Sequence, residues 1–455
     1  MTGLGVNVSG ARSAAIGAEH GITPSDLKRL TPRIVEAHAA MNRDRREGRV
    51  GFYDLYRDRD ALRTIQRLAL EMGKHGHENL VVLGIGGSAL GISTLMTALT
   101  PPLYNLRSRD ERSGRPRVFV IDNIDPYTIH HVLQQCPPEK TLFNVISKSG
   151  ATGETLAQLM IVLERLEAAL GKSRIAKHVV VTTGPSPKKG KTSPLEYIRK
   201  RYRLPSLEIP ENVGGRFSVF SAVGLFPAAV AGLDIDALAA GCAAMARRCR
   251  TASLKENPAY LRAAIQYLAC TNKRKSISVM MAYSDALSDV SDWYRQLWAE
   301  SLGKRRVSPD GPEQHVGQTP VKALGVTDQH SQLQLYLEGP NDKTITVLEE
   351  TRFRKDLRIP SIFPKSAGMA YLAGQSLGKL MDAERRATID ALREAKRPVM
   401  RITLPTVNAH TVAQLLYMLE METAMAGQLF GVNAFDQPAV ERIKVLTRRY
   451  MGAHL

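Results

Sequence analysis

Residues 79–91 read Asn79-Leu-Val-Val-Leu-Gly-Ile-Gly-Gly-Ser-Ala-Leu-Gly91. The short, mostly apolar run at 79–83 is followed by a glycine-rich loop and then by an apolar segment that continues beyond residue 91. Continuous apolar runs of this length are typical of strands that are buried on both faces of a parallel sheet. Glycines permit the sharp turn that such a strand needs before a helix. This stretch therefore predicts a strand–loop–helix unit of an α/β domain.

The same alternation continues along the first half of the chain. Further Val- and Ile-rich runs occur at residues 117–121, 141–146 and 178–182, with helix-length segments at 90–99 and 155–170. Short buried strands that alternate with helices predict a doubly wound domain with a mostly parallel sheet.

A second set of elements begins near residue 276. The sequence predicts strands at 276–281, 332–337, 344–348 and 399–404, and helices at 291–302, 408–427 and 440–450. A mostly helical region at 233–268 links the two sets. The run Lys275-Ser-Ile-Ser-Val-Met resembles the run that begins at Asn79, which hints at two related sheets.

The N-terminal region is polar, and its pattern is helical over about the first 50 residues. The run Thr23-Pro-Ser-Asp26 is typical of a helix cap, and it precedes a predicted helix at 27–41.

Length and composition exclude several classes of protein. A chain of 455 residues has room for two domains of roughly 100–200 residues each. Hydrophobic residues make up 44% and charged residues 23%, which excludes a disordered or collagen-like chain. Four cysteines are too few for a disulfide framework, so we expect reduced thiols and a cytoplasmic protein. The longest run without polar residues, 222–233, is too short to span a membrane, and the N-terminus lacks a secretory pattern.

The net charge is +18, from 62 basic and 44 acidic residues. A basic chain can bind nucleic acids, membrane surfaces or small anions. The basic residues lie partly in short clusters between apolar segments and have few aromatic neighbours, and no nucleic-acid module is recognisable. We therefore interpret the charge as a solvated surface and predict neither a nucleic-acid nor a membrane partner.

The glycine loop of residues 84–91 suits an anion, because the N-terminus of the following helix offers free backbone N–H groups and a favourable dipole. Gly84-x-Gly86-x-x-Ala89 also fits the dinucleotide-binding pattern loosely. The acidic residue expected about 20 positions later falls in an arginine-rich loop without a strand end. Both interpretations remain open from this loop alone.

The loop Ser147-Lys-Ser-Gly-Ala-Thr-Gly-Glu-Thr155 follows another predicted strand and opens a helix. It holds four hydroxyls, two glycines and a lysine within nine residues. A helix cap needs one hydroxyl, whereas several hydroxyls and N–H groups can surround the oxygens of a phosphate. We predict a phosphate site here.

Candidate acid–base groups are Glu300 in a helix-like run, His330 in a polar loop and Lys444 on the last helix. Each of them, taken singly, is more often a solvated surface side chain. Arg216 follows Gly214-Gly215, a turn that can deliver a guanidinium either into a cleft or to the surface. No set of His, Cys or Asp residues has the spacing of metal ligands.

Six motifs occur together in the order of one known family. They are Gly84-Ile-Gly-Gly-Ser, Ser147-Lys-Ser-Gly-x-Thr-x-Glu-Thr, Val213-Gly-Gly-Arg-Phe-Ser, Gln296-x-x-x-Glu300-Ser, Asp328-Gln-His-Ser-Gln and Phe435-Asp-Gln-Pro-x-Val-Glu-x-x-Lys444. In these motifs, over residues 84–444, the chain resembles the glucose-6-phosphate isomerases. Ordered co-occurrence is far more specific than any single motif, so it outweighs the surface interpretation of the single residues.

The resemblance implies two sugar-isomerase (SIS) α/β domains, each a mostly parallel sheet flanked by helices, with helical terminal arms. The implied boundaries are an N-terminal arm at 1–60, a first domain at 61–232, a helical linker at 233–270, a second domain at 271–425 and a C-terminal arm at 426–455. It also implies a homodimer with a shared active site that binds a small sugar phosphate.

The resemblance also implies a role for each motif residue. The phosphate would lie on the serine–threonine loop and the glycine loop, at Ser147, Lys148, Ser149, Thr152, Gly87 and Ser88. Glu300 would move the proton between C2 and C1, and Arg216 would stabilise the enediolate. His330 would come from the partner subunit and open the sugar ring, and Lys444 would assist at the ring oxygen. Gln296 and Gln437 would line the site.

The implied activity is the interconversion of glucose 6-phosphate and fructose 6-phosphate, in glycolysis and gluconeogenesis. This chemistry needs a carboxylate base, a cation where the enediolate forms and a remote phosphate handle. It requires no metal or organic cofactor. The sequence departs from the family pattern at Ala89, where many members carry an acid, and at Ala439, where glycine is common.

Three alternatives remain at this stage. An NAD-dependent dehydrogenase would use the glycine loop, but the ribose-binding acid is missing. A sugar-phosphate sensor would need the phosphate loop but not Glu300, His330 and Lys444 together. A broader isomerase would also accept mannose 6-phosphate, because a phosphate loop does not distinguish sugar epimers.

Overall fold

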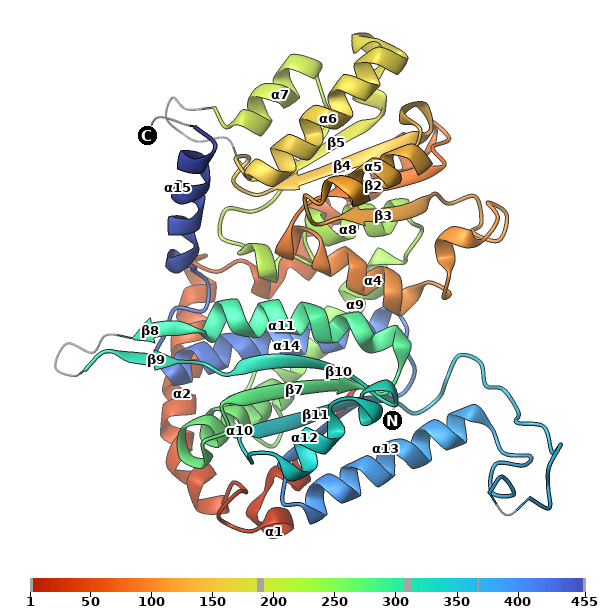
Figure 1. The fold of residues 1–455 in the computed structure, drawn as a ribbon. Helices are drawn as coiled ribbons and strands as arrows, with labels where there is room; N and C mark the ends of the chain where they lie inside the picture. The colour runs from red at the N-terminus through yellow and green to blue at the C-terminus, as the bar shows by residue number, and fades with distance from the viewer. Residues whose placement is uncertain (1–2, 186–191, 307–311, 367, 453–455) are drawn as a thin grey trace.

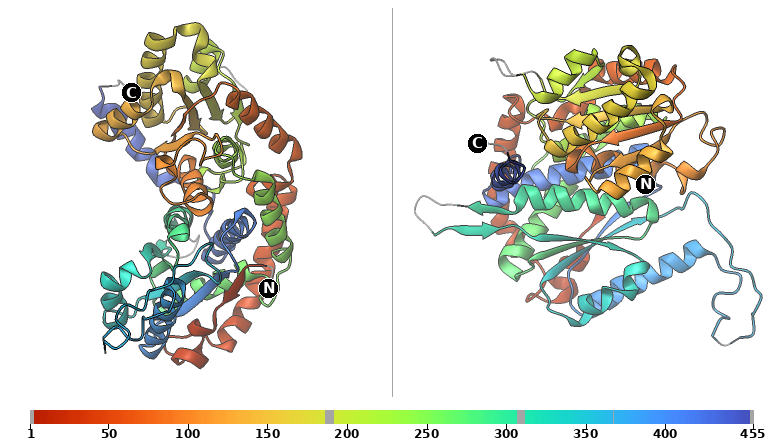
Figure 2. Two further views of the ribbon diagram at one scale, coloured as in Figure 1. Left: turned by 90° about the vertical axis from the view of Figure 1, so that its right-hand side faces the viewer. Right: turned by 45° about the horizontal axis from the view of Figure 1, so that its top comes forward.

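The computed structural model describes residues 3–185, 192–306, 312–366 and 368–452. The chain forms two lobes, each built on a five-stranded sheet, with helices on both faces of each sheet (Figure 1). Figure 2 shows the two lobes from two further sides. The prediction of two α/β domains with mostly parallel sheets is confirmed.

The first sheet has the strand order β3-β2-β4-β5-β6, and all of its strands are parallel. The strands are β2 (Asn79–Leu83), β3 (Arg117–Ile121), β4 (Thr141–Ser147), β5 (Val179–Thr183) and β6 (Ser206–Glu208). In β2, β4 and β5 every residue is buried, which is why these segments read as continuous apolar runs.

Helices cover both faces of the first sheet. One face packs on α5 (Pro126–Gln135), α6 (Gly153–Leu170) and α7 (Pro194–Tyr202). The other packs on α3 (Arg59–Gly73), α4 (Leu90–Leu99) and α8 (Ala222–Val230). Side chains alternate between the two faces along a strand. In β2, Val81 accordingly packs with the helices α5, α6 and α7, and Val82 packs with α3, α4 and α8.

The second sheet has the strand order β1-β12-β11-β7-β10. Its strands are β7 (Ile277–Ala282), β10 (Thr319–Leu324), β11 (Lys343–Glu350), β12 (Val399–Leu404) and β1 (Gly5–Asn7), of which only β1 is antiparallel to its neighbour. The outer face packs on α12 (Leu333–Glu338) and α13 (Leu377–Glu394), and the inner face on α10 (Pro258–Lys273), α11 (Ser288–Leu302) and α14 (Ala409–Phe430). The four parallel strands of this sheet, in the order β12-β11-β7-β10, therefore follow the same winding order as β5-β4-β2-β3 of the first sheet.

One continuous apolar core joins the inner faces of both sheets. It includes α9 (Ile235–Arg248), α10, α11 and α14, and α14 is buried over almost its whole length. Within it Arg262 and Glu422 form a fully buried ion pair with a Nε–Oε2 distance of 2.7 Å. Pairing is what makes two buried charges tolerable, so this contact fixes α10 against α14.

The N-terminal segment runs along the second lobe. It consists of β1, α1 (Ser13–Ile16) and α2 (Pro24–Arg46). The predicted cap of α2 is confirmed, because the Thr23 hydroxyl accepts from the Asp26 N–H and the Asp26 carboxylate accepts from the Thr23 N–H. The C-terminal helix α15 (Glu441–Tyr450) lies beside the first lobe (Figures 1 and 2).

Most predicted elements are confirmed, but the prediction of a strand at residues 332–337 was wrong. Its alternating apolar pattern belongs to the short helix α12, which buries Tyr336. Parallel strands need a crossover connection, and α12 lies in the crossover between β10 and β11.

Several strands and helices were missed. β10 contains Pro320, is only partly buried and lies at the sheet edge, where proline is tolerated. The other missed strands are β1, β6 and the hairpin of β8 (Lys304–Arg306) and β9 (Gln314–Val316), and the missed helices include α3, α5, α7, α8 and α13.

Candidate active site

The two predicted phosphate loops lie side by side at the carboxyl edge of the first sheet. The glycine loop follows β2, the serine–threonine loop follows β4, and these two strands are hydrogen-bonded neighbours. The chain leaves β2 for β3 on one side and reaches β4 on the other, so the winding direction reverses between them. In open α/β sheets ligands bind in the crevice at such a switch point.

Glycines in the first loop allow three segments to meet. A Cβ on Gly87 would lie 2.1 Å from the carbonyl oxygen of Gly215, and a Cβ on Gly86 would lie 2.8 Å from Nε2 of Gln296. Gly86 also has a φ of +58°, a conformation that side-chain-bearing residues rarely adopt. Only glycine therefore lets this loop touch both the Arg216 loop and helix α11.

The serine–threonine loop presents its hydroxyls at the start of α6. The Ser147 and Thr152 hydroxyls are 2.8 Å apart, and the Ser149 hydroxyl accepts from the Ala151 N–H. Thr152 is the N-cap residue, but its side chain makes no cap hydrogen bond. Among the described residues, the first N–H groups of α6 thus have no side-chain acceptor, which is the arrangement an anion site needs.

Two further features of this loop bear on anion binding. The Thr155 hydroxyl is one of the four hydroxyls of the predicted phosphate loop, although the resemblance implied no role for it. It is buried and has no hydrogen-bond partner among the described residues. Lys148 donates from Nζ to the carbonyl oxygen of Glu211, and burial lowers the pKa of this lysine.

Arg216 is the most constrained side chain of the site. It lies in the turn η7 (Gly215–Phe217) and is 3% exposed. Its Nε donates to the Ser301 hydroxyl at 2.7 Å, and its Nη1 donates to Oε1 of Gln437 at 3.1 Å. Its Nη2 donates to the carbonyl oxygens of Ala434 and Asp436. Burial lowers the pKa of the guanidinium, and the carboxylates of Glu300 and Asp436 oppose that shift.

Glu300 lies in the last turn of α11, between two polar partners. One carboxylate oxygen is 3.3 Å from Nη1 of Arg216, and the other accepts from Nε2 of Gln296 at 2.9 Å. Gln296 precedes Glu300 by four residues, which places both side chains on one face of the helix. The Glu300 side chain is 29% exposed, so a ligand can reach the carboxylate.

Glu300 and Gln437 line a cavity of about 990 Å³. Its other walls come from the β8–β9 hairpin and from the chain between α14 and α15, including Lys304, His315, Asn433, Asp436 and Pro438. The cavity is large enough to hold a sugar phosphate.

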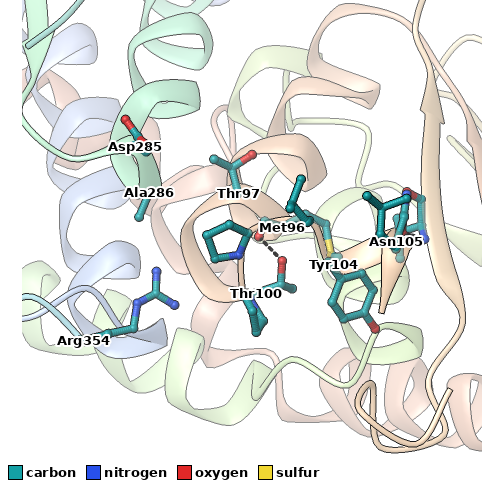
Figure 3. A pocket seen from close by; sticks show the side chains of 13 residues that line it. Met96, Thr97, Thr100, Tyr104, Asn105, Asp285, Ala286 and Arg354 are labelled. Atoms are coloured by element: carbon teal, nitrogen blue, oxygen red, sulfur yellow. Dashed lines mark hydrogen bonds between the residues drawn. The ribbon is translucent and has the colours of Figure 1, made fainter. Parts of the chain in front are cut away.

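A second cavity, of about 490 Å³, lies between the two lobes, away from the predicted site residues (Figure 3). Residues of α4 and the following loop, including Met96, Thr97 and Tyr104, line one side of it. Asp285, Ala286 and Arg354 approach from the second lobe. Its lining mixes apolar side chains with polar ones such as Thr100 and Asn105, and none of the predicted site residues belongs to it.

The structure therefore brings most predicted residues together within one chain. Arg216, Gln296, Glu300 and Gln437 form one hydrogen-bonded group, and the phosphate-loop residues Gly87, Ser88, Ser147, Lys148, Ser149 and Thr152 lie at the adjacent sheet edge. Ser301 and Thr155 stand in the quoted motifs, but neither was named as a site residue. Ser301 directly follows the predicted base, and its hydroxyl signals a role only once the Arg216 contact is known.

His330 and Lys444 are not joined to this group by any hydrogen bond or ion pair within the described part of the chain. His330 is exposed in the turn η9 (Thr327–His330) after β10. Lys444 is exposed on α15, where Nζ is 2.6 Å from Oε1 of Glu441.

The described residues also lack two other kinds of feature. Over these ranges no group of three His, Cys, Asp or Glu side chains is arranged to hold a metal ion. None of the helices that the structure describes has the length and apolar character needed to cross a bilayer.

Comparison with known proteins finds relatives over nearly the whole chain. The family model of phosphoglucose isomerase matches residues 70–453. A glucose-6-phosphate isomerase of Carboxydothermus hydrogenoformans is 45% identical over 94% of this chain and 90% of its own. A second, from Rubrobacter xylanophilus, is 42% identical over 95% of both chains.

Solved structures give the same result for the fold. A hypothetical protein from Thermus thermophilus superposes with a TM-score of 0.85 at 37% identity, over 99% of this chain and 100% of that one. A glucose-6-phosphate isomerase from Chlamydia trachomatis superposes with a TM-score of 0.70 at 22% identity, over 87% and 73% of the two chains. The family model covers every motif from the glycine loop to Lys444, and two relatives exceed 40% identity over nearly the whole chain, so this chain belongs to the phosphoglucose isomerase family.

Proposed function

We propose that Glu300 is the base with which this chain isomerises glucose 6-phosphate to fructose 6-phosphate, with Arg216 stabilising the enediolate. The chain is an enzyme, an aldose–ketose isomerase of glucose 6-phosphate, as its family membership establishes. The proposal concerns which residues perform each step. The observation that carries it is the Glu300 carboxylate, which faces a large cavity while Arg216 and Gln296 hold its two oxygens.

The phosphate of the substrate would bind at the first switch point. Ser147, Ser149, Thr152 and Thr155 offer hydroxyls there, Lys148 offers charge, and α6 offers free N–H groups. The glycine loop with Gly87 and Ser88 closes the other side. A phosphate fixed at this point is a remote handle whose binding energy orients the reacting carbons.

The proton transfer then follows from the position of Glu300. In the open-chain sugar, the carboxylate takes the proton from C2, the C1–C2 double bond forms, and negative charge develops on O1. Arg216 places positive charge beside this oxygen, where it stabilises the enediolate. Glu300 returns its proton to C1, the O2 hydroxyl gives up its proton and O1 gains one, which yields the ketose. Gln296 donates a hydrogen bond to Glu300, and Gln437 accepts one from Arg216, so the two glutamines hold these charged groups in position.

Ring opening would require the two residues that lie apart from this group. We assign it to His330 of the partner subunit, with Lys444 at the ring oxygen, in a homodimer with shared sites. The exposed position of His330 supports this arrangement. In addition, the described parts of the segment between β11 and α13 expose Leu357, Ile362, Phe363 and Tyr371. Clusters of exposed apolar side chains mark interaction surfaces.

We also place the enzyme in the cytoplasm, in glycolysis and gluconeogenesis. All four cysteines are free thiols, and three of them are buried, as suits a reducing compartment. Fractionation of cells with an antibody against the chain would test this location.

A coupled assay tests the proposed function. Purified protein should convert fructose 6-phosphate to glucose 6-phosphate without added metal, and nucleotide should be needed only by the dehydrogenase that reports glucose 6-phosphate. The Glu300→Gln and His330→Ala variants should each be inactive, and a mixture should regain part of the activity once subunits exchange. One site of a mixed dimer would then be intact. Demonstrated exchange without recovered activity would show that both residues serve the same subunit's site.

A further inference from the structure

Lys304 is a partly buried cation beside the candidate site. It begins β8, four residues after Glu300, and its side chain is only 10% exposed. It lines the same cavity as Glu300 and Gln437. Lysine is seldom buried without a partner, so its contacts indicate what it does.

The partner of Lys304 is Asp436. The Lys304 ammonium donates to the carboxylate of Asp436 at 2.7 Å and to the carbonyl oxygen of the same residue. That carbonyl oxygen also accepts from Nη2 of Arg216 at 2.9 Å. The other carboxylate oxygen of Asp436 accepts from Nδ2 of Asn433 at 2.9 Å. Lys304 and Arg216 therefore hold the same peptide group from two directions.

The loop at 433–437 determines where the guanidinium points. Three of the acceptors that hold Arg216 come from it, namely the carbonyl oxygens of Ala434 and Asp436 and the Gln437 side chain. The loop lies between α14 and α15, whereas Lys304 lies two residues after the end of α11, the helix that carries Glu300. One ammonium thus ties the helix of the base to the loop that orients the arginine.

Charge supports the same role. The Asp436 carboxylate interacts favourably with the Arg216 guanidinium. With Lys304 removed, Asp436 would carry uncompensated negative charge next to Arg216 and would compete for it with Glu300 and with the substrate oxygen. Lys304 neutralises this competitor.

We propose that Lys304 is a positioning residue of the isomerase, which acts through Asp436 to keep Arg216 aimed at the substrate. This inference rests on the role assigned to Arg216 above. In this role Lys304 does not bind the phosphate. Replacing Lys304 should therefore lower kcat and leave substrate binding nearly intact.

The test compares Lys304→Met, Lys304→Arg and Asp436→Asn with the wild type in the coupled assay. We expect Lys304→Met to lower kcat by roughly 10- to 100-fold with KM within about threefold, because transition-state stabilisation is lost and phosphate binding is kept. Lys304→Arg keeps the charge and should recover much of kcat. Asp436→Asn keeps the side-chain size and should also lower kcat with little effect on KM.

A double variant distinguishes action through Asp436 from direct contact with the substrate. If Lys304 works through Asp436, combining Lys304→Met with Asp436→Asn should lower kcat no further than the worse single change. Additive losses would mean that Lys304 acts independently, and this result would overturn the proposal. A raised KM with unchanged kcat would overturn it as well.

Lys343 supplies a matched control. It is a buried lysine that bonds to the Asp342 carboxylate and to the carbonyl oxygen of Pro340, at the amino end of the second sheet. Lys343→Met should leave kcat of the folded enzyme within about twofold of the wild type, as expected for a site remote from the substrate.

If Lys304→Met fails to fold, as judged by circular dichroism, Asp436→Asn and Lys304→Arg still decide the question. An inactive wild type would contradict the proposed function, whereas an active wild type matched by Lys304→Met would contradict this inference alone.

Discussion

The two sheets wind in the same order but end in different chemistry. In the first, the neighbouring strands at the switch point lead into a glycine loop and a hydroxyl-rich loop. In the second sheet the corresponding strands are β7 and β11. Tyr283 directly follows β7, and β11 ends with Glu349 and Glu350. A cavity of about 620 Å³ lies at the second edge.

The carboxylates of the second edge are held by protein partners. Glu349 accepts from the Thr403 hydroxyl and pairs with Arg385, and Glu350 accepts from the Ser284 hydroxyl. Two carboxylates at a switch point disfavour a phosphate, whereas free N–H groups and hydroxyls favour it. The comparison shows that strand order creates the crevice and that a few loop side chains decide whether an anion can bind there.

Replacing the proposed base should have the largest effect. Glu300→Gln keeps the shape of the side chain and loses its basic oxygen, so kcat should fall by about 10²–10⁴ with little change in KM. Glu350→Gln at the second edge should stay within about twofold of the wild type, since that site takes no part in the reaction. Steady-state kinetics of both variants measure the difference. Equal losses of kcat would contradict the proposal that the reaction takes place at Glu300 and not at the second edge.

Arg216→Lys should have the next largest effect. Lysine keeps the positive charge but cannot replace a planar group that donates to Ser301, Gln437 and two carbonyl oxygens. We expect kcat to fall by about 10²-fold, as for the loss of one donor to a developing oxyanion. Full activity in the lysine variant would show that charge alone is sufficient.

The phosphate loop should act on binding. Thr152→Ala removes a hydroxyl from the loop, and a hydrogen bond to a charged group contributes about 1.5–3 kcal/mol, so KM should rise roughly 10- to 100-fold. The counterpart at the second edge is Thr351→Ala, whose hydroxyl donates to the carbonyl oxygen of Pro405. That variant should bind substrate normally. A Thr152→Ala enzyme with wild-type kinetics would exclude this hydroxyl from the site.

The smallest effect on turnover is expected from a change at His77, at the amino end of the first sheet, which should alter stability and not kcat. His77, just before β2, is 7% exposed, and burial together with His178 and His75 lowers its pKa to about 4. An unfolded chain would take up this proton near pH 6.5, so stability is complete above about that pH and falls as pH drops toward 4, by on the order of 3 kcal/mol in total. Urea unfolding at several pH values should show the loss, and His77→Gln should flatten it without changing kcat at neutral pH. An unchanged slope in that variant would assign the acid sensitivity elsewhere.

Burial explains which elements the sequence could predict. The strand at Asn79–Leu83 and the helix at Leu90–Leu99 were predicted to the residue, because both are apolar and lie between clear turn signals. The edge strand β10 and the crossover helix α12 were not recognised, since tertiary position and not local pattern determines them.

The site likewise contains residues that the sequence motifs identified and residues that only the structure reveals. The motifs identified Arg216, Gln296, Glu300 and Gln437, and the structure joins these four side chains by hydrogen bonds and an ion pair. Ser301 and Lys304 could not be predicted, because their importance lies in contacts with residues far away in sequence. The roles of His330 and Lys444 remain predictions, because a single chain does not bring them to Glu300.

Hydrogen exchange at the substrate carbons tests the central claim most directly. Wild-type enzyme and Glu300→Gln would be incubated with glucose 6-phosphate in D₂O, with deuterium incorporation and isomerisation followed by NMR. If Glu300 carries the proton, the wild type should exchange and isomerise, and the variant should lose both activities in parallel by about 10²-fold or more. A variant that still isomerises and exchanges within a few fold of the wild type would show that another group is the base.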